Sequence, residues 1–270
     1  CTVFMAVNGD SILVGSNEDW KNSNSQVFFV PAQNGKYGHA LFGYNGSVQG
    51  GLNEKGLFWD GLRAIPKIKI KNQDNRPDIG GNVLHKILED CAAVNDVINL
   101  FEQYYWDGFG LSQLMVVDKS GESAIITYDK NGLAITRRND FYQVCTNFRI
   151  FNENRMEKIN WYSIGSGRYK KAEKALQNKD ATVNDYFNIL DETSQRFFAK
   201  TIYSTVCNLN SGTIWISVNR DYSRIISLNL FDELDKTKHS YYLSDLIKSN
   251  KENRKRFEIL DENFLTENGD

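Results

Sequence analysis

Proline, histidine, net charge and long apolar runs are all scarce in this sequence of 270 residues. Only three prolines and 20 glycines are present, which argues against long disordered linkers. The net charge of −2 supplies neither a basic field for nucleic acid nor a polybasic patch for a membrane surface. No apolar run approaches the roughly 20 residues of a membrane-spanning helix. We therefore predict no nucleic-acid partner and no membrane insertion.

Motifs for metals and cofactors are also missing. Cys1, Cys91, Cys145 and Cys207 are too far apart for a compact zinc site, and they do not suggest a disulfide framework. The stretch Gly165-Ser166-Gly167-Arg168 lacks the Gly-x-x-x-x-Gly-Lys-Ser/Thr pattern of a phosphate loop. We interpret it as a loop before a helix over residues 168–177, and we predict no cofactor and no metal.

The hydrophobic pattern predicts strands, helices, strands, helices and strands, in that order. A first hairpin is expected around Asn8-Gly9-Asp10, because Asn-Gly is favoured in tight strand reversals. Helical periodicity predicts helices near 82–91, 94–105, 168–177 and 183–193. Several antiparallel hairpins favour an α+β layered fold over a doubly wound parallel sheet. Length and composition fit one large domain or two small ones. We predict one domain over 1–270, with 236–270 as a charged C-terminal extension packed on it.

The chain opens CTVFMAVNGDSILVGSNEDW, so its first residue carries both a thiol and an α-amino group. A thiolate is a strong nucleophile, but an ordinary cysteine pKa of ~8.5 leaves little thiolate at neutral pH. A free α-amino group, with an ordinary pKa of about 7.7–8.0, is suited to accept the thiol proton. Such a residue also needs a carboxylate to orient its ammonium. Asp19 is the candidate, because the hairpin returns it towards Cys1.

Alternatives for Cys1 stay open on the residues alone. The histidines His39, His85 and His239 leave room for a cysteine–histidine dyad, although nothing local points to one. A lipid-modified cysteine is a second interpretation, but such anchors usually precede a polar tether, and here a strand begins at Val3. Signal-peptide removal, loss of a short pro-segment, methionine excision and an arbitrary start all leave the same first residue. Signal-peptide removal would favour an extracytoplasmic location; otherwise the compartment is unknown.

The first twenty residues resemble N-terminal nucleophile (Ntn) hydrolases of the choloylglycine hydrolase and penicillin V acylase superfamily, which includes acyl-CoA:6-aminopenicillanate acyltransferases and acid-ceramidase-like amidases. Members begin with Cys-Thr or a similar pair, and their hairpin ends in Arg/Gln-Asn-x-Asp, matched here by Ser16-Asn17-Glu18-Asp19. Four later segments match in order: GLNEKGLFWDGL (51–62), LMVVDKSGESAIITYD (114–129), VCTNF (144–148) and YSTVCNLNSGTIWIS (203–217). The resemblance spans most of residues 1–230.

The resemblance implies a four-layer αββα sandwich that hydrolyses a linear, non-peptide C–N amide bond of a small N-acyl substrate through a Cys1 thioester. Cys1 would be nucleophile and base, Asp19 would hold its α-amino group, and Asn147 would donate its side-chain amide to the oxyanion. The late active-site arginine is assigned to Arg220, with Arg224 as its rival. Acyl transfer to an amine and a non-catalytic, lipid-anchored or secreted binding protein are the alternatives. Assembly into a dimer or tetramer is left open.

Two departures from the family argue against bile-salt specificity. Bile-salt hydrolases have an arginine three residues before the motif aspartate, where this chain has Ser16. Their Gly-Leu-Asn, a second oxyanion donor, is here Gly61-Leu62-Arg63. Aromatic and charged residues beside the motifs would line the acyl pocket or give it a charged wall, although core aromatics and a surface ion pair are the plainer explanations. The candidates for substrate binding are Trp20, Trp59, Asp60 and Arg63.

Overall fold

The computed structural model describes residues 1–21, 24–44, 47–72, 74–80, 83–129, 131–150, 164–197 and 199–249. Its strands form two sheets whose neighbouring strands run antiparallel. The six-stranded sheet has the order β10 (Tyr142–Cys145), β1 (Thr2–Asn8), β2 (Ser11–Trp20), β11 (Lys200–Asn208), β12 (Thr213–Val218) and β13 (Ile226–Asn229). The eight-stranded sheet has the order β14 (His239–Tyr242), β3 (Ser25–Val30), β4 (His39–Tyr44), β5 (Ser47–Asn53), β6 (Leu57–Arg63), β7 (Ser112–Asp118), β8 (Ser123–Asp129) and β9 (Gly132–Arg137).

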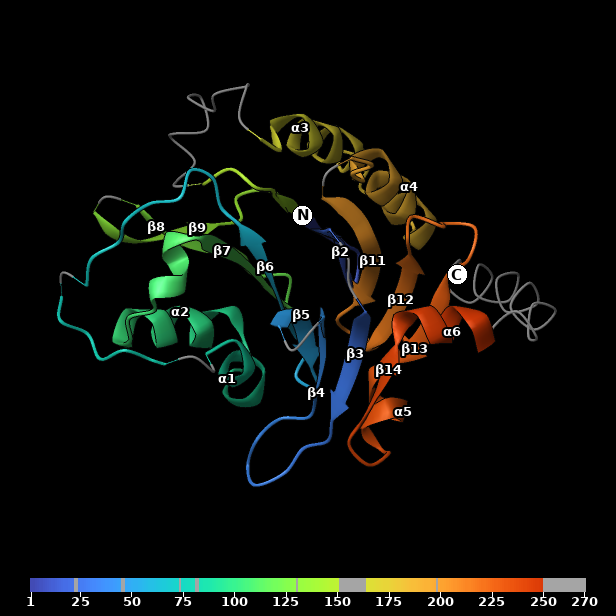
Figure 1. Cartoon of the computed structure of the whole chain (residues 1–270), viewed down its shortest axis with the longest axis horizontal. Coiled ribbons are helices and arrows are strands. Elements are labelled where there is room, and N and C mark those ends of the chain that lie inside the picture. Colours follow the sequence, from blue (N-terminus) through green and yellow to red (C-terminus); the bar gives the residue numbers. More distant parts are fainter. Residues whose placement is uncertain are drawn as a thin grey trace.

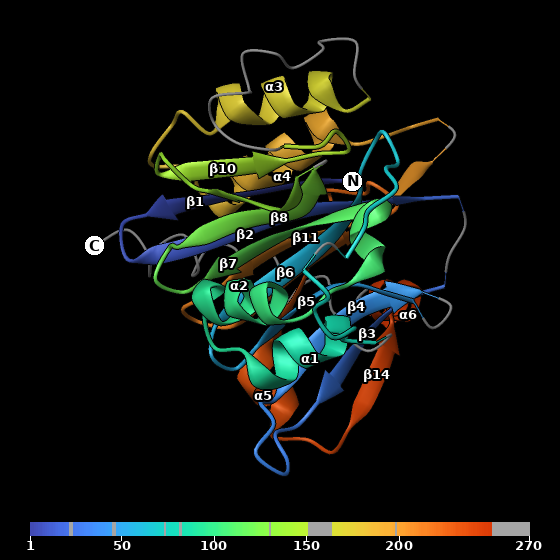
Figure 2. The ribbon, with the colours of Figure 1, turned by 90° about the vertical axis from the view of Figure 1, so that its left-hand side faces the viewer.

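Helices cover the outer faces of the two sheets (Figures 1 and 2). The described helices are α1 (Val83–Asp90), α2 (Val94–Gln103), α3 (Ser166–Ala175), α4 (Val183–Thr193), α5 (Leu230–Leu234) and α6 (Leu243–Ser249), with a 3₁₀ turn at Asp107–Gly110. Helices α3 and α4 contact the six-stranded sheet, and α1 and α2 contact the eight-stranded one. The predicted αββα sandwich is confirmed. None of the described helices is long and apolar enough to cross a membrane.

The first hairpin forms as its sequence predicts and fixes the start of the chain inside the fold. Gly9 and Asp10 form a two-residue loop, and Gly9 has a φ of +56°, which glycine adopts without steric cost. Both faces of this hairpin are covered, so its residues are buried almost without interruption. On the helix side, Phe4 packs on Tyr186 of α4, with ring centroids 5.2 Å apart.

The described part of the C-terminal segment packs on the eight-stranded sheet. The predicted charged extension begins at residue 236, and its first part forms β14, which pairs with β3, and α6, which contacts β3 and β14. The rest of the predicted extension, residues 250–270, lies outside the described residues.

Candidate active site

The α-amino group of Cys1 lies between two side chains that accept its hydrogen bonds. Its nitrogen is 2.6 Å from Asp19 Oδ2 and 2.9 Å from Asn147 Oδ1. Strand register explains this convergence. Val3 faces Ser16 on β2 and Cys145 on β10, so extending both ladders by two residues brings Cys1 level with positions 18 and 147. The strands on either side of β1 therefore lead to the two acceptors: Asn147 is level with Cys1, and Asp19 is one position further along.

Asp19 is held by further donors besides the Cys1 nitrogen. Gln195 Nε2 donates to its Oδ2 at 2.6 Å, and Thr201 Oγ1 donates to its Oδ1 at 2.5 Å. Thr201 lies opposite Asp19 in the β2–β11 ladder, and Gln195 lies in the connection between α4 and β11. The carboxylate is buried and fully hydrogen-bonded, so its position relative to the α-amino group is fixed.

Arg168 is a site residue that was not predicted from the sequence, where it stood only between a loop and the start of a helix. Its guanidinium donates to the Cys1 carbonyl oxygen, to Thr2 Oγ1 at 2.8 Å and to Asn147 Oδ1 at 2.6 Å. The same group lies 3.6 Å from Asp19 Oδ2. Burial lowers the pKa of the arginine, and the carboxylate of Asp19 opposes that shift. The guanidinium thus ties together the backbone and both acceptors of the α-amino group.

The start of α3 explains how Arg168 reaches the site. Gly165 caps the helix with a φ of +95°, and a Cβ there would lie 3.1 Å from the Asn147 nitrogen. Glycine therefore allows the helix to begin against the Asn147 segment. A cation in the first turn of a helix is unfavourable next to the positive end of its dipole. An arginine in the first turn of α3 is therefore the signal in the sequence that could have pointed to a specific role for Arg168.

The segment that carries Asn147 is fastened to the eight-stranded sheet. Asn147 Nδ2 donates to the Arg63 carbonyl oxygen at 2.8 Å, and the Ile65 nitrogen donates to the Asn147 carbonyl oxygen at 2.7 Å. Buried Gln113 donates to the carbonyl oxygens of Thr146 and Phe148 at 2.6 and 2.8 Å. Arg63 contributes its backbone here, while its own side chain is exposed.

Two buried carboxyl groups lie on the thiol side of Cys1. The Cys1 Sγ–H donates to Glu18 Oε1 at 3.4 Å, and Ser16 Oγ donates to Asp60 Oδ2 at 2.5 Å across the two sheets. Burial raises the pKa of Glu18 well above its usual value; Asp60 and Asp19 add to the rise, and the α-ammonium opposes it. Burial also raises the pKa of Asp60 to about 7 against the Ser16 hydrogen bond and the α-ammonium. Glu18 was not among the predicted site residues, and Asp60 was predicted to form a charged wall of the pocket with Arg63.

The remaining predicted site residues lie apart from the sulfur. Trp59 is completely buried in the cluster beneath α1 and α2. Trp20 follows Asp19 and is 41% exposed at the end of β2. Arg220 lies in the turn between β12 and β13 with a φ of +62°, and Arg224 pairs with Asp221. No contact between either arginine and Cys1 is found among the described residues.

The histidines are engaged elsewhere in the part of the chain that the structure describes. His39 is buried against the Tyr37 carbonyl oxygen, and burial lowers its pKa. His239 Nε2 lies 2.8 Å from Glu233 Oε2. His85 lies on α1, on the outer side of the eight-stranded sheet. No described contact places a histidine on Cys1, so the geometry favours the α-amino group over a cysteine–histidine dyad.

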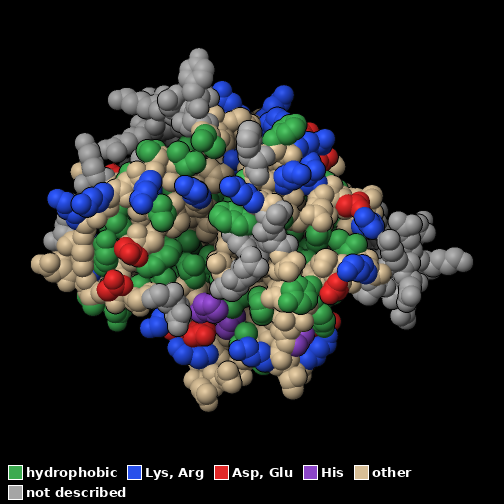
Figure 3. All heavy atoms as spheres, viewed as in Figure 1, with side chains coloured by type: hydrophobic (Ala, Val, Ile, Leu, Met, Phe, Trp, Pro, Cys, Tyr) green, Lys and Arg blue, Asp and Glu red, His purple; other side chains and the backbone are tan. Residues whose placement is uncertain are grey.

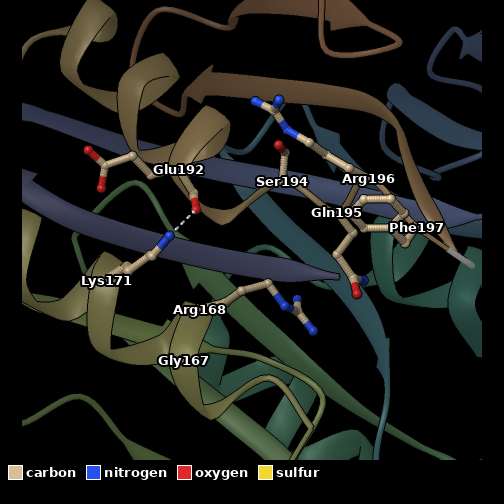
Figure 4. Close-up of a pocket in the computed structure, with 8 residues that line it drawn as sticks. All are labelled: Gly167, Arg168, Lys171, Glu192, Ser194, Gln195, Arg196 and Phe197. Carbon is tan, nitrogen blue, oxygen red and sulfur yellow. Dashed lines mark hydrogen bonds between the residues drawn. The ribbon is translucent and has the colours of Figure 1, made fainter.

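An open pocket of about 470 Å³ adjoins the Cys1 site (Figure 4). Two of its residues belong to that site, because Arg168 contacts Cys1 and Gln195 contacts Asp19. In the close-up, Arg168 and Gln195 point towards one another, and Lys171 bonds to the Glu192 carbonyl oxygen at 3.1 Å. The lining residues are Gly167, Arg168, Lys171, Glu192, Ser194, Gln195, Arg196 and Phe197. Three cations and one carboxylate line this pocket, and two of the cations, Arg168 and Arg196, are also paired with Asp19 and Asp191.

Solved structures share this fold at low sequence identity. Penicillin V acylase from Agrobacterium tumefaciens is 18% identical over 89% of this chain and 90% of its own, with a TM-score of 0.70. A mutant of conjugated bile acid hydrolase from Clostridium perfringens is 18% identical over 89% and 96%, with a TM-score of 0.72. The N-acylethanolamine-hydrolyzing acid amidase ortholog from Caenorhabditis elegans is 15% identical over 90% and 100%, with a TM-score of 0.57.

The sequence also matches a family directly. A comparison with curated proteins found no match. Residues 5–233, however, match the family described as acyl-coenzyme A:6-aminopenicillanic acid acyl-transferase. This match covers most of the chain, from the first strand to α5, and it includes Asp19, Asn147 and Arg168. The family match is consistent with the fold of two sheets that this chain shares with the solved structures. The chain therefore belongs to the acyl-coenzyme A:6-aminopenicillanic acid acyl-transferase family, within the Ntn-hydrolase superfamily.

Proposed function

We propose that the protein is a cysteine amidase that hydrolyses a linear, non-peptide C–N amide bond through a thioester on Cys1. The observation that carries this proposal is the α-amino group of Cys1, held between Asp19 and Asn147 on the same residue as a thiol. Membership of an acyl-transferring family supports it, since acyl transfer and amide hydrolysis share an acyl-enzyme.

In the proposed reaction, an acceptor in the site takes the S–H proton of Cys1, Sγ attacks the amide carbonyl carbon, and the C–N bond breaks to leave a thioester. The acceptor returns that proton when the thiolate is released at the end of the cycle. The α-ammonium, oriented by Asp19, gives a proton to the departing amine. The α-amino group, now neutral, takes a proton from a water molecule whose oxygen attacks the thioester and releases the acid. Arg168 keeps Cys1 and Asn147 in position through its hydrogen bonds.

Asn147 is the proposed oxyanion donor. A carboxamide nitrogen carries two hydrogens; one is directed to the Arg63 carbonyl oxygen at 2.8 Å, and the second is the proposed partner of the oxyanion. A neutral donor fixed in this way stabilises charge that appears only in the transition state. A backbone N–H group is the expected second donor.

The pocket beside the site supports a substrate with a carboxylate, such as an N-acyl amino acid. Arg168, Lys171 and Arg196 line it, with Glu192 as the only acid of its lining. Arg168 and Arg196 also lie 3.6 and 3.7 Å from the carboxylates of Asp19 and Asp191. Figure 3 also shows lysine and arginine side chains across the upper part of the face where the N-terminus lies in Figure 1. A positive field favours the approach of an anionic substrate. Trp20, which follows Asp19 and is 41% exposed, stays the proposed contact for the acyl group.

The decisive experiment traps the acyl-enzyme. The protein is incubated with N-acyl amino acids, bile salts and penicillin V, and its N-terminal peptide is analysed by mass spectrometry. We expect acyl-Cys1 with at least one substrate, and no turnover by Cys1→Ala or Cys1→Ser. An alanine variant with full activity would overturn the proposal. Lipid on Cys1 in the intact mass would instead support an anchored binding protein.

Acyl transfer to an amine is the second candidate, and the family match is what favours it. It differs only in the acceptor, because an amine takes the place of water at the thioester. Adding amine acceptors to the turnover assay separates the two functions. Formation of the new amide in preference to the free acid would identify a transferase.

A further inference from the structure

Glu18 is a buried carboxyl group in contact with the sulfur of Cys1. It is 2% exposed, and its Oε1 accepts the Sγ–H hydrogen bond at 3.4 Å. Its Oε2 has no hydrogen-bond partner among the described residues, and the same holds for Oδ1 of Asp60. Buried carboxyl groups are normally paired or fully hydrogen-bonded. The two unsatisfied oxygens beside a nucleophile therefore call for a functional explanation.

Another buried glutamate shows what a structural carboxyl group looks like in this fold. Glu233, 6% exposed, accepts hydrogen bonds from Lys236, His239 and Tyr241. Within the described ranges, neither Glu18 nor Asp60 has a lysine or arginine partner. The Glu18 carboxyl group is thus not held by a structural ion pair.

Burial and two neighbouring carboxylates favour proton uptake by Glu18, and the α-ammonium opposes it. From the chain start it faces the α-ammonium, from its own strand Asp19, and from β6 Asp60. Burial, Asp60 and Asp19 raise its pKa, which brings the carboxyl group closer to the ordinary thiol pKa of ~8.5. Proton transfer between groups of similar pKa costs little free energy. The nearby thiols of Cys145 and Cys207 are buried with raised pKa values, so they stay protonated.

We propose that Glu18 is a further catalytic residue, which takes the thiol proton from Cys1 and holds it while the acyl group is on sulfur. The inference rests on the proposed function and assigns to Glu18 a proton transfer that the sequence analysis gave to the α-amino group. That group, when charged, donates to Asp19 and Asn147 and has no lone pair for the thiol proton. Glu18 is the acceptor already in contact with Sγ.

The proton balance closes over one cycle. In acylation the S–H proton moves to Glu18, sulfur bonds to the acyl carbon, and the C–N bond breaks as the amine takes a proton from the α-ammonium. In deacylation the α-amino group takes a proton from water, and the hydroxide oxygen bonds to the acyl carbon. The C–S bond breaks, and the thiolate recovers its proton from Glu18. The amide and one water become an acid and an amine.

The test isolates thiol deprotonation by using p-nitrophenyl acetate, whose leaving group needs no proton. The burst of p-nitrophenolate from the wild-type protein is measured from pH 5 to 9 and compared with that of Glu18→Gln, with acetyl-Cys1 confirmed by mass. We expect a burst rate about 100-fold lower at pH 7 in Glu18→Gln, with its rise displaced to higher pH. Glu18→Asp should recover part of the rate. Glu233→Gln is the matched control, and we expect it to lose stability while its pH profile is retained.

Alkylation of Cys1 by iodoacetamide separates a chemical role from a structural one. We expect Glu18→Gln to be alkylated at least as fast as the wild type at pH 9, because a negative charge beside sulfur has gone. Equal slowing of alkylation and acylation, or an unchanged burst profile, would overturn the role of Glu18 alone. A wild-type protein that forms no acetyl-Cys1 would overturn the proposed nucleophile. If Glu18→Gln does not fold, the Asp60→Asn variant is measured in its place. The burst rate of Asp60→Asn should rise at a lower pH than that of the wild type, because the like charge beside Glu18 is gone. A burst rate that rises at the wild-type pH would contradict the role of Glu18.

Discussion

Replacing Asp19 by asparagine removes the charge that holds the α-ammonium of Cys1. At the 2.6 Å separation of Asp19 Oδ2 and the Cys1 nitrogen, Coulomb's law with an effective dielectric constant of 20 gives a gross attraction of about 6 kcal/mol. Desolvation cancels part of this, and breaking one partner of a buried pair typically costs ~3–5 kcal/mol. If the transition state is destabilised by this whole free energy, the rate falls by about two to four powers of ten.

We therefore expect Asp19→Asn to lower kcat about 10²- to 10⁴-fold in amide turnover, with a smaller effect on the melting temperature. Asp118→Asn is the matched control, since Asp118 is equally buried, 5% exposed, and bonds to Val94 and Ser120 away from Cys1. It should lower the melting temperature and leave kcat unchanged. An Asp19→Asn enzyme with wild-type kcat would refute the reasoning.

Three further predictions concern the groups around this pair. Arg168→Met should lower kcat about 10- to 100-fold in steady-state kinetics. Arg168→Lys should not restore kcat, because an ammonium cannot span the same three acceptors. Because the pKa of Asp60 is raised to about 7 in the folded protein, this carboxyl group loses its proton at a lower pH in the unfolded chain than in the folded one. The free energy of unfolding should then fall from about pH 4 to about pH 7, and urea titrations should show a weaker fall in Asp60→Asn. Lys171→Met with Arg196→Met should raise KM for N-acyl amino acids about tenfold but not KM for neutral N-acyl amines; equal changes for both would argue against a carboxylate pocket.

The sequence alone predicted the part of the site that depends on local structure. The Asn8-Gly9 turn and the alternation along the hairpin determine its register, and with it the return of Asp19 to Cys1. Asn147 needed the family resemblance, because the pairing of β1 with β10 joins strands far apart in the chain, which no local pattern specifies. Arg220 was assigned from the order of motifs, whereas the guanidinium found at Cys1 comes from α3.

Glu18 had a signal in the sequence that the analysis did not use. A strand covered on both faces should be nearly continuous in apolar residues, yet β2 carries Ser16 and Glu18 at alternate positions. Such positions share one face of the strand, and in the fold that face turns towards Asp60 on the opposite sheet. Polar residues at these buried positions indicated a site, although the identity of their partners depended on how the two sheets stack.

The exchange at position 16 changes how the thiol can be activated. An arginine there would lie beside the buried carboxyl group of Asp60, pair with it and stabilise a nearby thiolate by its charge. Ser16 can only donate a hydrogen bond to Asp60, and the cation of the site, Arg168, binds instead to the backbone of Cys1 and to Asn147 on the amine side. Among the described residues no lysine or arginine contacts the sulfur, so ionisation of the thiol would depend on a nearby acceptor for its proton. The raised pKa of Glu18 suits that acceptor, so in the proposed mechanism Glu18 would act where serine, not arginine, stands at position 16.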